Sequence, residues 1–264
     1  MRQPVLFLGH GSPMTVISDV PERRAWVALG KALPRLRTIL VITAHWETHG
    51  KTHVTADAHP RTIHDFRGFP QALYDIQYPA PGSAELIDRI AALLGEDRMA
   101  RDTLWGFDHG AWGVVQPMFP AADIPMVAMS LDRSLDADGH LAIGQALAPL
   151  RDEGVLIIGS GNIVHNIAIR DYPPGTIFDW AAQFRDRIVR ATVDDDHAAL
   201  TRFRADDRDV TLAVNSAEHY LPLLYAIGAR LPDDGVGVFN DTLDRGLAMT
   251  SLLIGDVALL GGIV

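Results

Sequence analysis

The chain has 264 residues, of which 48% are hydrophobic and 21% are charged, which is enough apolar material for one large buried core. The formal net charge is −10 and no basic cluster offsets it, so a nucleic-acid partner is not expected. The chain contains no cysteine, which excludes disulfides, thiolate metal sites and cysteine nucleophiles and leaves imidazole and carboxylate as metal ligands.

The hydropathy pattern gives no reason to expect a membrane protein. No apolar run approaches the ~20 residues needed to span a bilayer. The amino-terminal residues also lack the apolar stretch and cleavage site of a secretory signal. We therefore expect a cytoplasmic location and no membrane partner.

Strand-like and helix-like segments alternate in the first half of the chain. An apolar strand is predicted at residues 5–9, followed by a helix with Asp19 as the expected N-cap and Pro21 in its first turn. A second strand is predicted at residues 38–43. Residues 49–81 are rich in Pro, Gly, His and aromatic residues and predict a long ordered loop with one short helix, a type of segment that often carries function.

The alternation continues in the second half. Ser83 is the expected N-cap of one helix, and Ser216 is the expected N-cap of a later helix that contains Glu218 and His219. The other predicted elements are strands at 124–131, 155–159, 235–239 and 248–254 and helices at 137–152 and 179–193. This order predicts an α/β fold: a single domain over residues 1–264 with a mostly parallel central sheet, helices on both faces and an active site at the carboxyl edge of the strands.

Three histidines follow predicted strands near the point where each strand ends: His10, His45 and His165. The carboxyl ends of parallel strands meet at one edge of a sheet, and neutral imidazole is the commonest metal ligand in proteins. A single histidine in such a place is more often a hydrogen-bonded core or loop residue. Three in the same setting predict a metal site.

Sequence context separates the other histidines. His109 lies in a turn that contains glycine and tryptophan, and His219 lies near a predicted helix start, so both join the candidates. The histidines in polar or charged surroundings are predicted to be surface residues: His49, His53, His59, His140 and His197.

The motifs around these histidines resemble the 4,5-DOPA extradiol dioxygenase family, a subgroup of the class III, or LigB-type, extradiol ring-cleavage dioxygenases. They are residues 9–14 (GHGSPM), 44–46 (AHW), 63–70 (IHDFRGFP), 71–75 (QALYD), 78–82 (YPAPG), 105–110 (WGFDHG), 159–166 (GSGNIVHN) and 218–224 (EHYLPLL). The resemblance spans nearly the whole chain in order, which makes it far more specific than any one motif.

The resemblance implies a mononuclear non-haem iron(II) enzyme that opens a catechol ring next to its hydroxyl pair with O2. It implies that His10, His45 and His219 are at the metal. His165 matches the family's acid–base histidine, which can also become a fourth ligand when Zn(II) takes the place of iron. His109 matches a second catalytic histidine near the substrate and dioxygen.

Class III enzymes in general use two histidines and a glutamate, and the matching position here offers both Glu218 and His219. Adjacent residues on a helix point about 100° apart, so only one of them reaches the metal. We choose His219, as the DOPA-type subgroup suggests. Glu218 remains the alternative ligand, or a partner of the ligand.

Several other residues are candidates for supporting roles. Asp108 is expected either to orient His109 or to cap the helix that follows it. Trp46 and Trp112 are candidates for stacking on an aromatic substrate, although buried tryptophans mostly belong to the core. The loop residues His64, Asp65, Phe66 and Phe69 are candidates for a lid or pocket wall.

The sequence thus leads to the hypothesis of an Fe(II)-dependent extradiol dioxygenase acting on a DOPA-like or related catecholic acid. The expected partners are a small catechol and O2, and the expected assembly is a monomer or a homodimer. Two alternatives stay open: a zinc-dependent hydrolase, because three histidines with an open position also describe catalytic zinc sites, and a non-catalytic metal-binding relative.

Overall fold

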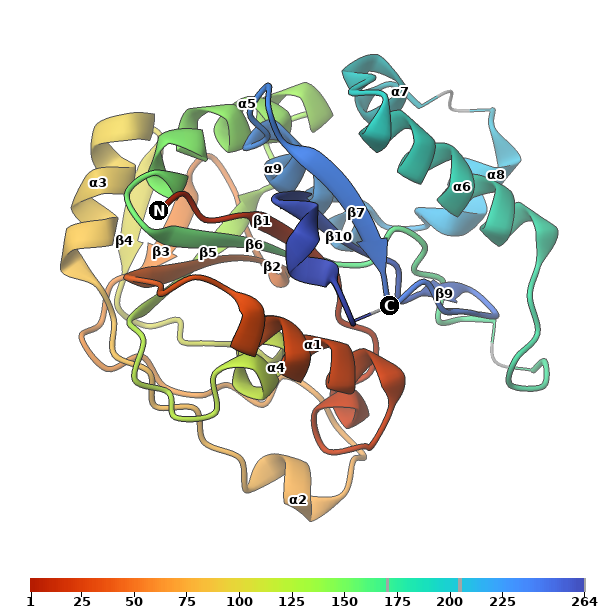
Figure 1. Cartoon of the computed structure of the whole chain (residues 1–264), viewed down its shortest axis with the longest axis horizontal. Helices are drawn as coiled ribbons and strands as arrows, with labels where there is room; N and C mark the ends of the chain where they lie inside the picture. The colour runs from red at the N-terminus through yellow and green to blue at the C-terminus, as the bar shows by residue number, and fades with distance from the viewer. Residues whose placement is uncertain (170, 204–205, 264) are drawn as a thin grey trace.

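The computed structural model describes residues 1–169, 171–203 and 206–263. Its main sheet has the strand order β4-β3-β5-β2-β6-β1-β10-β7 (Figure 1). The strands are β1 (Val5–Gly9), β2 (Thr38–Thr48), β3 (Thr52–Thr55), β4 (Met99–Asp102), β5 (Met126–Asp132), β6 (Val155–Gly161), β7 (Gly235–Phe239) and β10 (Ser251–Gly255). The central strands β5, β2, β6 and β1 are mutually parallel, and antiparallel pairs occur only toward the two edges of this sheet, so the prediction of a mostly parallel α/β fold is confirmed.

Helices cover both faces of the sheet (Figure 1). One face packs on α3 (Ala84–Leu94), α5 (Ala137–Leu147), α6 (Asp179–Val193) and α9 (Leu221–Gly228), and the other packs on α1 (Pro21–Ala32) and α4 (His109–Met118). Short helices are α2 (Gln71–Tyr74), α7 (His197–Thr201) and α8 (Arg208–Ala213). Because side chains alternate along a strand, β1 sends Val5 and Phe7 into one core and Leu6 into the other, which explains its continuous apolar sequence.

One predicted helix cap, Asp19, is wrong, and another, Ser216, takes the cap position of a shorter helix than expected. Ser83 accepts a hydrogen bond from the backbone N–H of Leu86 and caps α3, as predicted. Val20 occupies the cap position of α1, and Asp19 instead forms an exposed ion pair with Arg24. The segment around Ser216 is a short 3-10 helix, η3 (Ala217–His219), and α9 begins only afterwards.

The strands β3 and β4 were not predicted. Each has four residues, and β3 lies inside the segment expected to be a loop. Their sequences, THVT and MARD, are too short and too polar to show a strand period, and β4 is an edge strand. Pairing with the neighbouring strands, which is a long-range effect, creates them.

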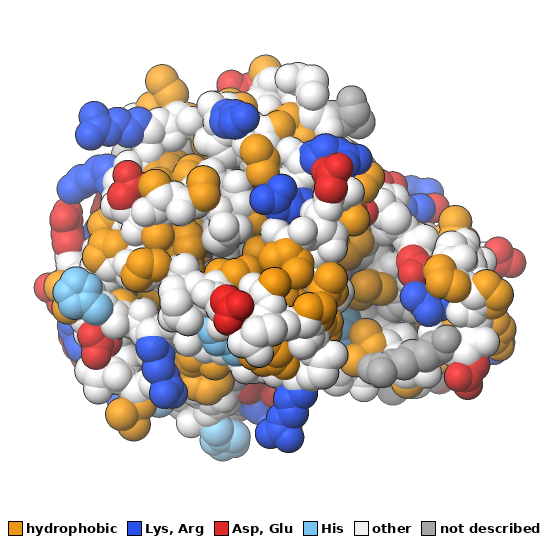
Figure 2. Space-filling view, turned by 90° about the horizontal axis from the view of Figure 1, so that it is seen from below, with side chains coloured by type: hydrophobic (Ala, Val, Ile, Leu, Met, Phe, Trp, Pro, Cys, Tyr) orange, Lys and Arg blue, Asp and Glu red, His pale blue; other side chains and the backbone are white. Residues whose placement is uncertain are grey.

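The distribution of charged side chains on one face of the molecule matches the expectation that basic residues do not cluster. Figure 2 shows a face on which Lys and Arg side chains are scattered among acidic and hydrophobic ones rather than gathered in one patch. Among the helices of the described residues, none is long and apolar enough to cross a membrane.

The prediction that His140 is a surface residue is wrong. His140 is fully buried on α5, and its Nδ1 lies 2.9 Å from the hydroxyl of Tyr225 on α9. It belongs to a buried stripe with Ile143 and Leu147, at the spacing of one helix face, so its immediate polar neighbours in the sequence were misleading. Burial lowers the pKa of His140 to about 4.

We expect His140 to make the protein less stable as the pH falls from about 6.5 to about 4. In that window His140 binds a proton in the unfolded chain but not in the folded one. The free energy of unfolding therefore falls by about 3 kcal/mol. Urea unfolding at several pH values checks this by comparing the wild type with His140→Gln, which cannot titrate. Parallel pH profiles for the two proteins would contradict the prediction.

Candidate active site

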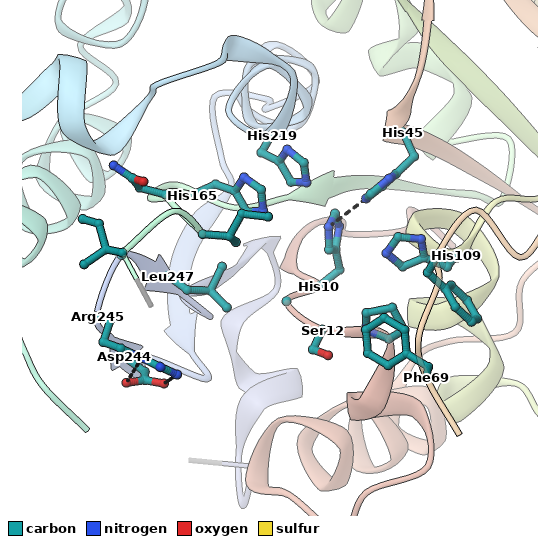
Figure 3. Close-up of a pocket in the computed structure, with 17 residues that line it drawn as sticks. His10, Ser12, His45, Phe69, His109, His165, His219, Asp244, Arg245 and Leu247 are labelled. Carbon is teal, nitrogen blue, oxygen red and sulfur yellow. Dashed lines mark hydrogen bonds and ion pairs between the residues drawn. The ribbon is translucent and has the colours of Figure 1, made fainter. Parts of the chain in front are cut away.

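Five histidines from different elements meet at one edge of the sheet (Figure 3). His10 directly follows β1, and His45 lies in β2 where its register with β5 shifts. His109 is the first residue of α4, His165 follows β6, and His219 ends η3. Since β1, β2 and β6 are parallel, this edge is their carboxyl edge, where the sequence placed the site.

Close backbone contacts bring the later segments over the strand ends. A Cβ on Gly161 would lie 2.1 Å from the carbonyl oxygen of His219, and the neighbouring Asn162 N–H donates to that same oxygen over 2.8 Å. A Cβ on Gly9 would lie 2.5 Å from the carbonyl oxygen of Met249. Glycine is therefore required at both strand ends for the histidines to approach one another.

The histidines open onto a cavity of about 560 Å³. All five line it, together with aromatic and aliphatic side chains that include Phe66, Phe69 and Leu247. The charged pair Asp244 and Arg245 lies at another part of the wall. A cavity of this size suits a small molecule, with its polar groups concentrated at the histidines.

Hydrogen bonds fix the tautomers of the two histidines from β1 and β2. The Nδ1 of His10 lies 3.0 Å from the hydroxyl of Ser160, which donates its own proton to the carbonyl of Gly110, so His10 is the donor. The Nδ1 of His45 lies 3.1 Å from a carboxylate oxygen of Asp65. Both rings therefore carry the proton on Nδ1 and present a bare Nε2.

His109 and His219 also donate a hydrogen bond from Nδ1 and present a bare Nε2. The other carboxylate oxygen of Asp65 accepts from the Nδ1 of His109 over 2.9 Å and from its backbone N–H over 2.9 Å. Glu218 accepts from the Nδ1 of His219 over 2.9 Å. Each imidazole thus has a partner that orients the ring and leaves Nε2 free to bind a metal or to accept a proton.

The donor set fits a metal ion. The bare Nε2 atoms of His10 and His45 face each other at 3.2 Å, a contact that repels unless a proton or a cation lies between them (Figure 3). Two imidazole nitrogens bound to one ion at ~2.1 Å would be about 3.0–3.4 Å apart. The ring centroids of His10, His45 and His219 form a nearly equilateral triangle with sides of 5.0, 5.2 and 5.2 Å. The ligand atoms of His10, His45 and His109 also lie within 4.8 Å of one another, so His109 is a further possible ligand by distance.

Burial favours the neutral, metal-binding form of His10 and His219. Burial and the neighbouring imidazoles lower the pKa of His10, and burial lowers the pKa of His219 despite the opposing effect of Glu218. Burial alone would raise the pKa of Asp65, but its hydrogen bonds from His109 and His45 outweigh that effect and lower it. His45 differs: burial alone would lower its pKa, but its hydrogen bond to Asp65 and the nearby carboxylates raise it. The site therefore combines neutral His10 and His219 with a carboxylate-paired His45.

His165 has a different relation to the cluster. Its ring stacks on His219, with 3.5 Å between centroids and 6° between planes. An imidazole binds a metal in its own plane, so of these two parallel rings His219 is the one that would hold an ion shared with His10 and His45. Their ligand atoms are close enough to share an ion, together with Glu218, but the parallel rings would have to turn first. Burial and the nearby His219 lower the pKa of His165 to about 3.

Three residues expected to contact substrate do not line the cavity. Trp46 stacks on Trp105 behind the site, because side chains alternate along β2 and His45 takes the inward position. Trp112 is fully buried and donates its indole N–H to the carbonyl of Ile63. His64 is held by the carbonyl of Ile76, 3.0 Å from its Nε2. Of the four residues predicted to bind substrate, Phe66 lines the cavity and Trp46, Trp112 and His64 do not.

Of the two roles considered for Asp108, the structure shows the helix cap. Its carboxylate accepts from the backbone N–H of Ala111 and from the hydroxyl of Thr43, 2.7 Å away. The residue that orients His109 is Asp65, which the sequence assigned only to the loop. Its position between a histidine and an aromatic residue was the available signal, but the contact spans 44 residues and has no local period.

The chain is similar to known ring-opening dioxygenases over most of its length. Residues 4–237 match the family model described as the catalytic LigB subunit of aromatic ring-opening dioxygenase. The chain belongs to this LigB family of ring-cleaving dioxygenases. It is 45% identical over 262 residues to a 4,5-DOPA dioxygenase extradiol of Escherichia coli K12, which covers 96% of this chain and 95% of the relative.

Other relatives agree with that family. A 4,5-DOPA dioxygenase extradiol of Beta vulgaris is 37% identical over 249 residues, or 91% of this chain and 92% of the relative. The crystal structure of an uncharacterized protein from Escherichia coli K12 superposes with a TM-score of 0.83 at 39% identity, covering 96% of this chain and all of that one. The LigB family match thus extends from sequence to fold.

We expect Asp65→Asn to weaken metal binding by about 10- to 100-fold, because the amide can accept from only one of the two imidazole N–H groups that the carboxylate holds. Competition with a chromophoric chelator measures the affinity. Asp102→Asn is the matched control, since Asp102 makes a similar pair with His53, 3.2 Å away and outside the cluster. Equal affinities in the two variants would contradict the role given to Asp65.

Proposed function

We propose that this chain is an iron(II)-dependent extradiol dioxygenase that inserts O2 into the ring of a DOPA-like or related catechol and gives a ring-opened semialdehyde. The observation that carries the proposal is the triangle of His10, His45 and His219, whose orienting partners leave Nε2 bare. The relatives named 4,5-DOPA dioxygenase extradiol support the substrate class.

The three histidines would hold iron(II) and leave the side toward the cavity open to the diol and O2. Iron(II), when bound, lowers the pKa of the catechol hydroxyls and brings the ring and dioxygen together. Phe66 and Phe69 form the wall beside His109 and shield the reacting ring from water.

His165 is proposed as the base that takes a proton from the catechol. It lines the cavity, is neutral near neutral pH, and stacks parallel on His219, an arrangement that does not suit two imidazoles bound to one ion. We therefore favour acid–base chemistry over metal binding for His165. A ring rotation that made it a ligand would be an alternative state of the same site.

His109 is proposed as the second proton carrier. Asp65 holds its Nδ1–H, so Nε2 can accept a proton and the carboxylate stabilises the resulting imidazolium. The family match argues against the zinc hydrolase, and the presence of both His109 and His165 in the cavity argues against a non-catalytic relative.

Anaerobic loading with Fe(II), followed by addition of a catechol and air, tests the function. We expect a yellow semialdehyde product and consumption of one O2 per catechol. The same protein loaded with Zn(II) is the matched control and should be inactive. Iron-loaded protein that consumes neither catechol nor O2 would refute the proposed function.

A further inference from the structure

The cavity has a charged end away from the histidines. A small hairpin, β8 (Leu243–Asp244) and β9 (Leu247–Ala248), turns through Arg245 and Gly246. Among the described residues that line the cavity, Asp244 is the only acidic residue and Arg245 is the only Lys or Arg. Figure 3 shows this pair on the opposite side of the cavity from His45 and His109, with Leu247 and Ser12 in the space between.

The backbone holds this hairpin tip in an uncommon conformation. Arg245 has a φ of 54°, in the left-handed region that disfavours residues other than glycine. Its N–H donates to the carbonyl of Thr176 over 2.6 Å, and the carbonyl of Gly246 accepts from the N–H of Asn166 over 2.6 Å. Residues held in this way are often functional. The contact to Asn166 also ties the tip to the segment that carries His165.

The two side chains form a pair with unused hydrogen-bonding capacity. The Nε and Nη2 of Arg245 lie 3.2 and 2.9 Å from the two carboxylate oxygens of Asp244. The Oδ1 of Asp244 also accepts from the N–H of Gly175 over 2.8 Å, which leaves Oδ2 as its less occupied oxygen. A guanidinium has five N–H donors, so the Nη1 group and one Nη2 hydrogen remain for a ligand. Both side chains are partly exposed, 28% for Arg245 and 37% for Asp244, so a ligand can reach them.

Adjacent opposite charges select a particular kind of substituent. A lone carboxylate beside Arg245 would also meet the negative charge of Asp244, and a lone ammonium beside Asp244 would meet the guanidinium. A group that carries both charges on neighbouring atoms matches the pair in each position. The α-amino acid group, with its carboxylate and ammonium on one carbon, has this arrangement.

We propose that the Asp244–Arg245 tip is the specificity-determining subsite for a zwitterionic α-amino acid substituent on the catechol ring. The carboxylate binds Arg245 and the ammonium binds Asp244, while the diol faces the histidines and the connecting carbons pass along Leu247. This inference rests on the proposed function, because it takes the histidine cluster as the site of the diol.

Four catechols with graded side chains test the subsite: 4-methylcatechol, dopamine, 3,4-dihydroxyphenylpropionate and DOPA. Each is measured by anaerobic equilibrium binding, where no turnover occurs, and by kcat/KM in air. Arg245→Asn removes the cation with a residue that tolerates a positive φ. We expect about 10- to 100-fold weaker binding of DOPA and dihydroxyphenylpropionate, and no more than a small change for 4-methylcatechol.

The companion variants make the test specific. Asp244→Asn should weaken the binding of DOPA and dopamine but strengthen the binding of dihydroxyphenylpropionate. Arg245→Lys should keep part of the preference for DOPA over 4-methylcatechol that Arg245→Asn loses. Arg2→Asn breaks an exposed ion pair with Asp152 remote from the cavity and should change nothing. The ratio of kcat/KM for DOPA to that for 4-methylcatechol does not depend on the fraction of folded enzyme, so poor folding of a variant does not obscure the result.

If Arg245→Asn lowered the affinity for DOPA and for 4-methylcatechol by the same factor, the proposed subsite would be refuted and the tip would be a structural turn. A wild-type preference for dihydroxyphenylpropionate over DOPA would overturn the zwitterion match. Failure of the proposed function gives a different result, because the iron-loaded wild type would then turn over none of the four catechols, 4-methylcatechol included.

Discussion

His10→Ala is expected to lose bound iron and all ring-cleavage activity, whereas His165→Ala is expected to keep the iron and lose turnover by about 10²- to 10⁴-fold. The difference follows from ring geometry. The Nε2 of His10 faces that of His45 at 3.2 Å, so removing it takes away one corner of the triangle. His165 lies parallel to His219 and contributes no corner.

Metal analysis after anaerobic iron loading and gel filtration, combined with single-turnover kinetics, separates the two outcomes. His59→Ala is the control, because His59 is an exposed histidine outside the cluster. His45→Ala and His219→Ala should behave like His10→Ala, and His109→Ala should behave like His165→Ala. Loss of iron from His165→Ala would instead identify this residue as a ligand whose ring turns when the metal binds.

The parts of the site that the sequence predicted share a local signal. His10 and His165 follow apolar strands and His45 follows the apolar part of β2, and strand direction alone brings such residues to one edge of a parallel sheet. The turn around His109 and the helix start near His219 added these two, and the resemblance of whole motifs then implied the role of each histidine. Local pattern was sufficient here because the chemistry lies where regular elements end.

The parts that the sequence did not predict depend on contacts between distant segments. Asp65 reaches His45 and His109 from an irregular loop, and no spacing rule connects them. The Asp244–Arg245 tip is held beside the cavity by bridges that pair Leu247 with His165 and Arg245 with Ile177. Trp46 also lies outside the cavity lining, because side chains alternate along β2 and His45 takes the inward position.

Arg151→Leu is expected to lower the free energy of unfolding by about 3–5 kcal/mol, the largest stability effect among these predictions. Arg151 is fully buried, and its guanidinium donates to the carbonyls of Gln3 and Ala229 while pairing with Asp234. It thereby joins the start of the chain, the end of α9 and the turn before β7. Urea unfolding at pH 7 measures the loss.

The physical reason for so large an effect is the charge left behind. Asp234 has a side chain only 6% exposed, so without Arg151 its carboxylate stays buried with no cation beside it, and two carbonyls lose their donors. Arg151→Leu combined with Asp234→Leu should therefore be more stable than Arg151→Leu alone, since it removes the stranded charge. Arg2→Leu provides the contrast, because the Arg2–Asp152 pair is exposed and its loss should cost less than about 1 kcal/mol. If Arg151→Leu cost no more than Arg2→Leu, the buried pair would not be what joins these three segments.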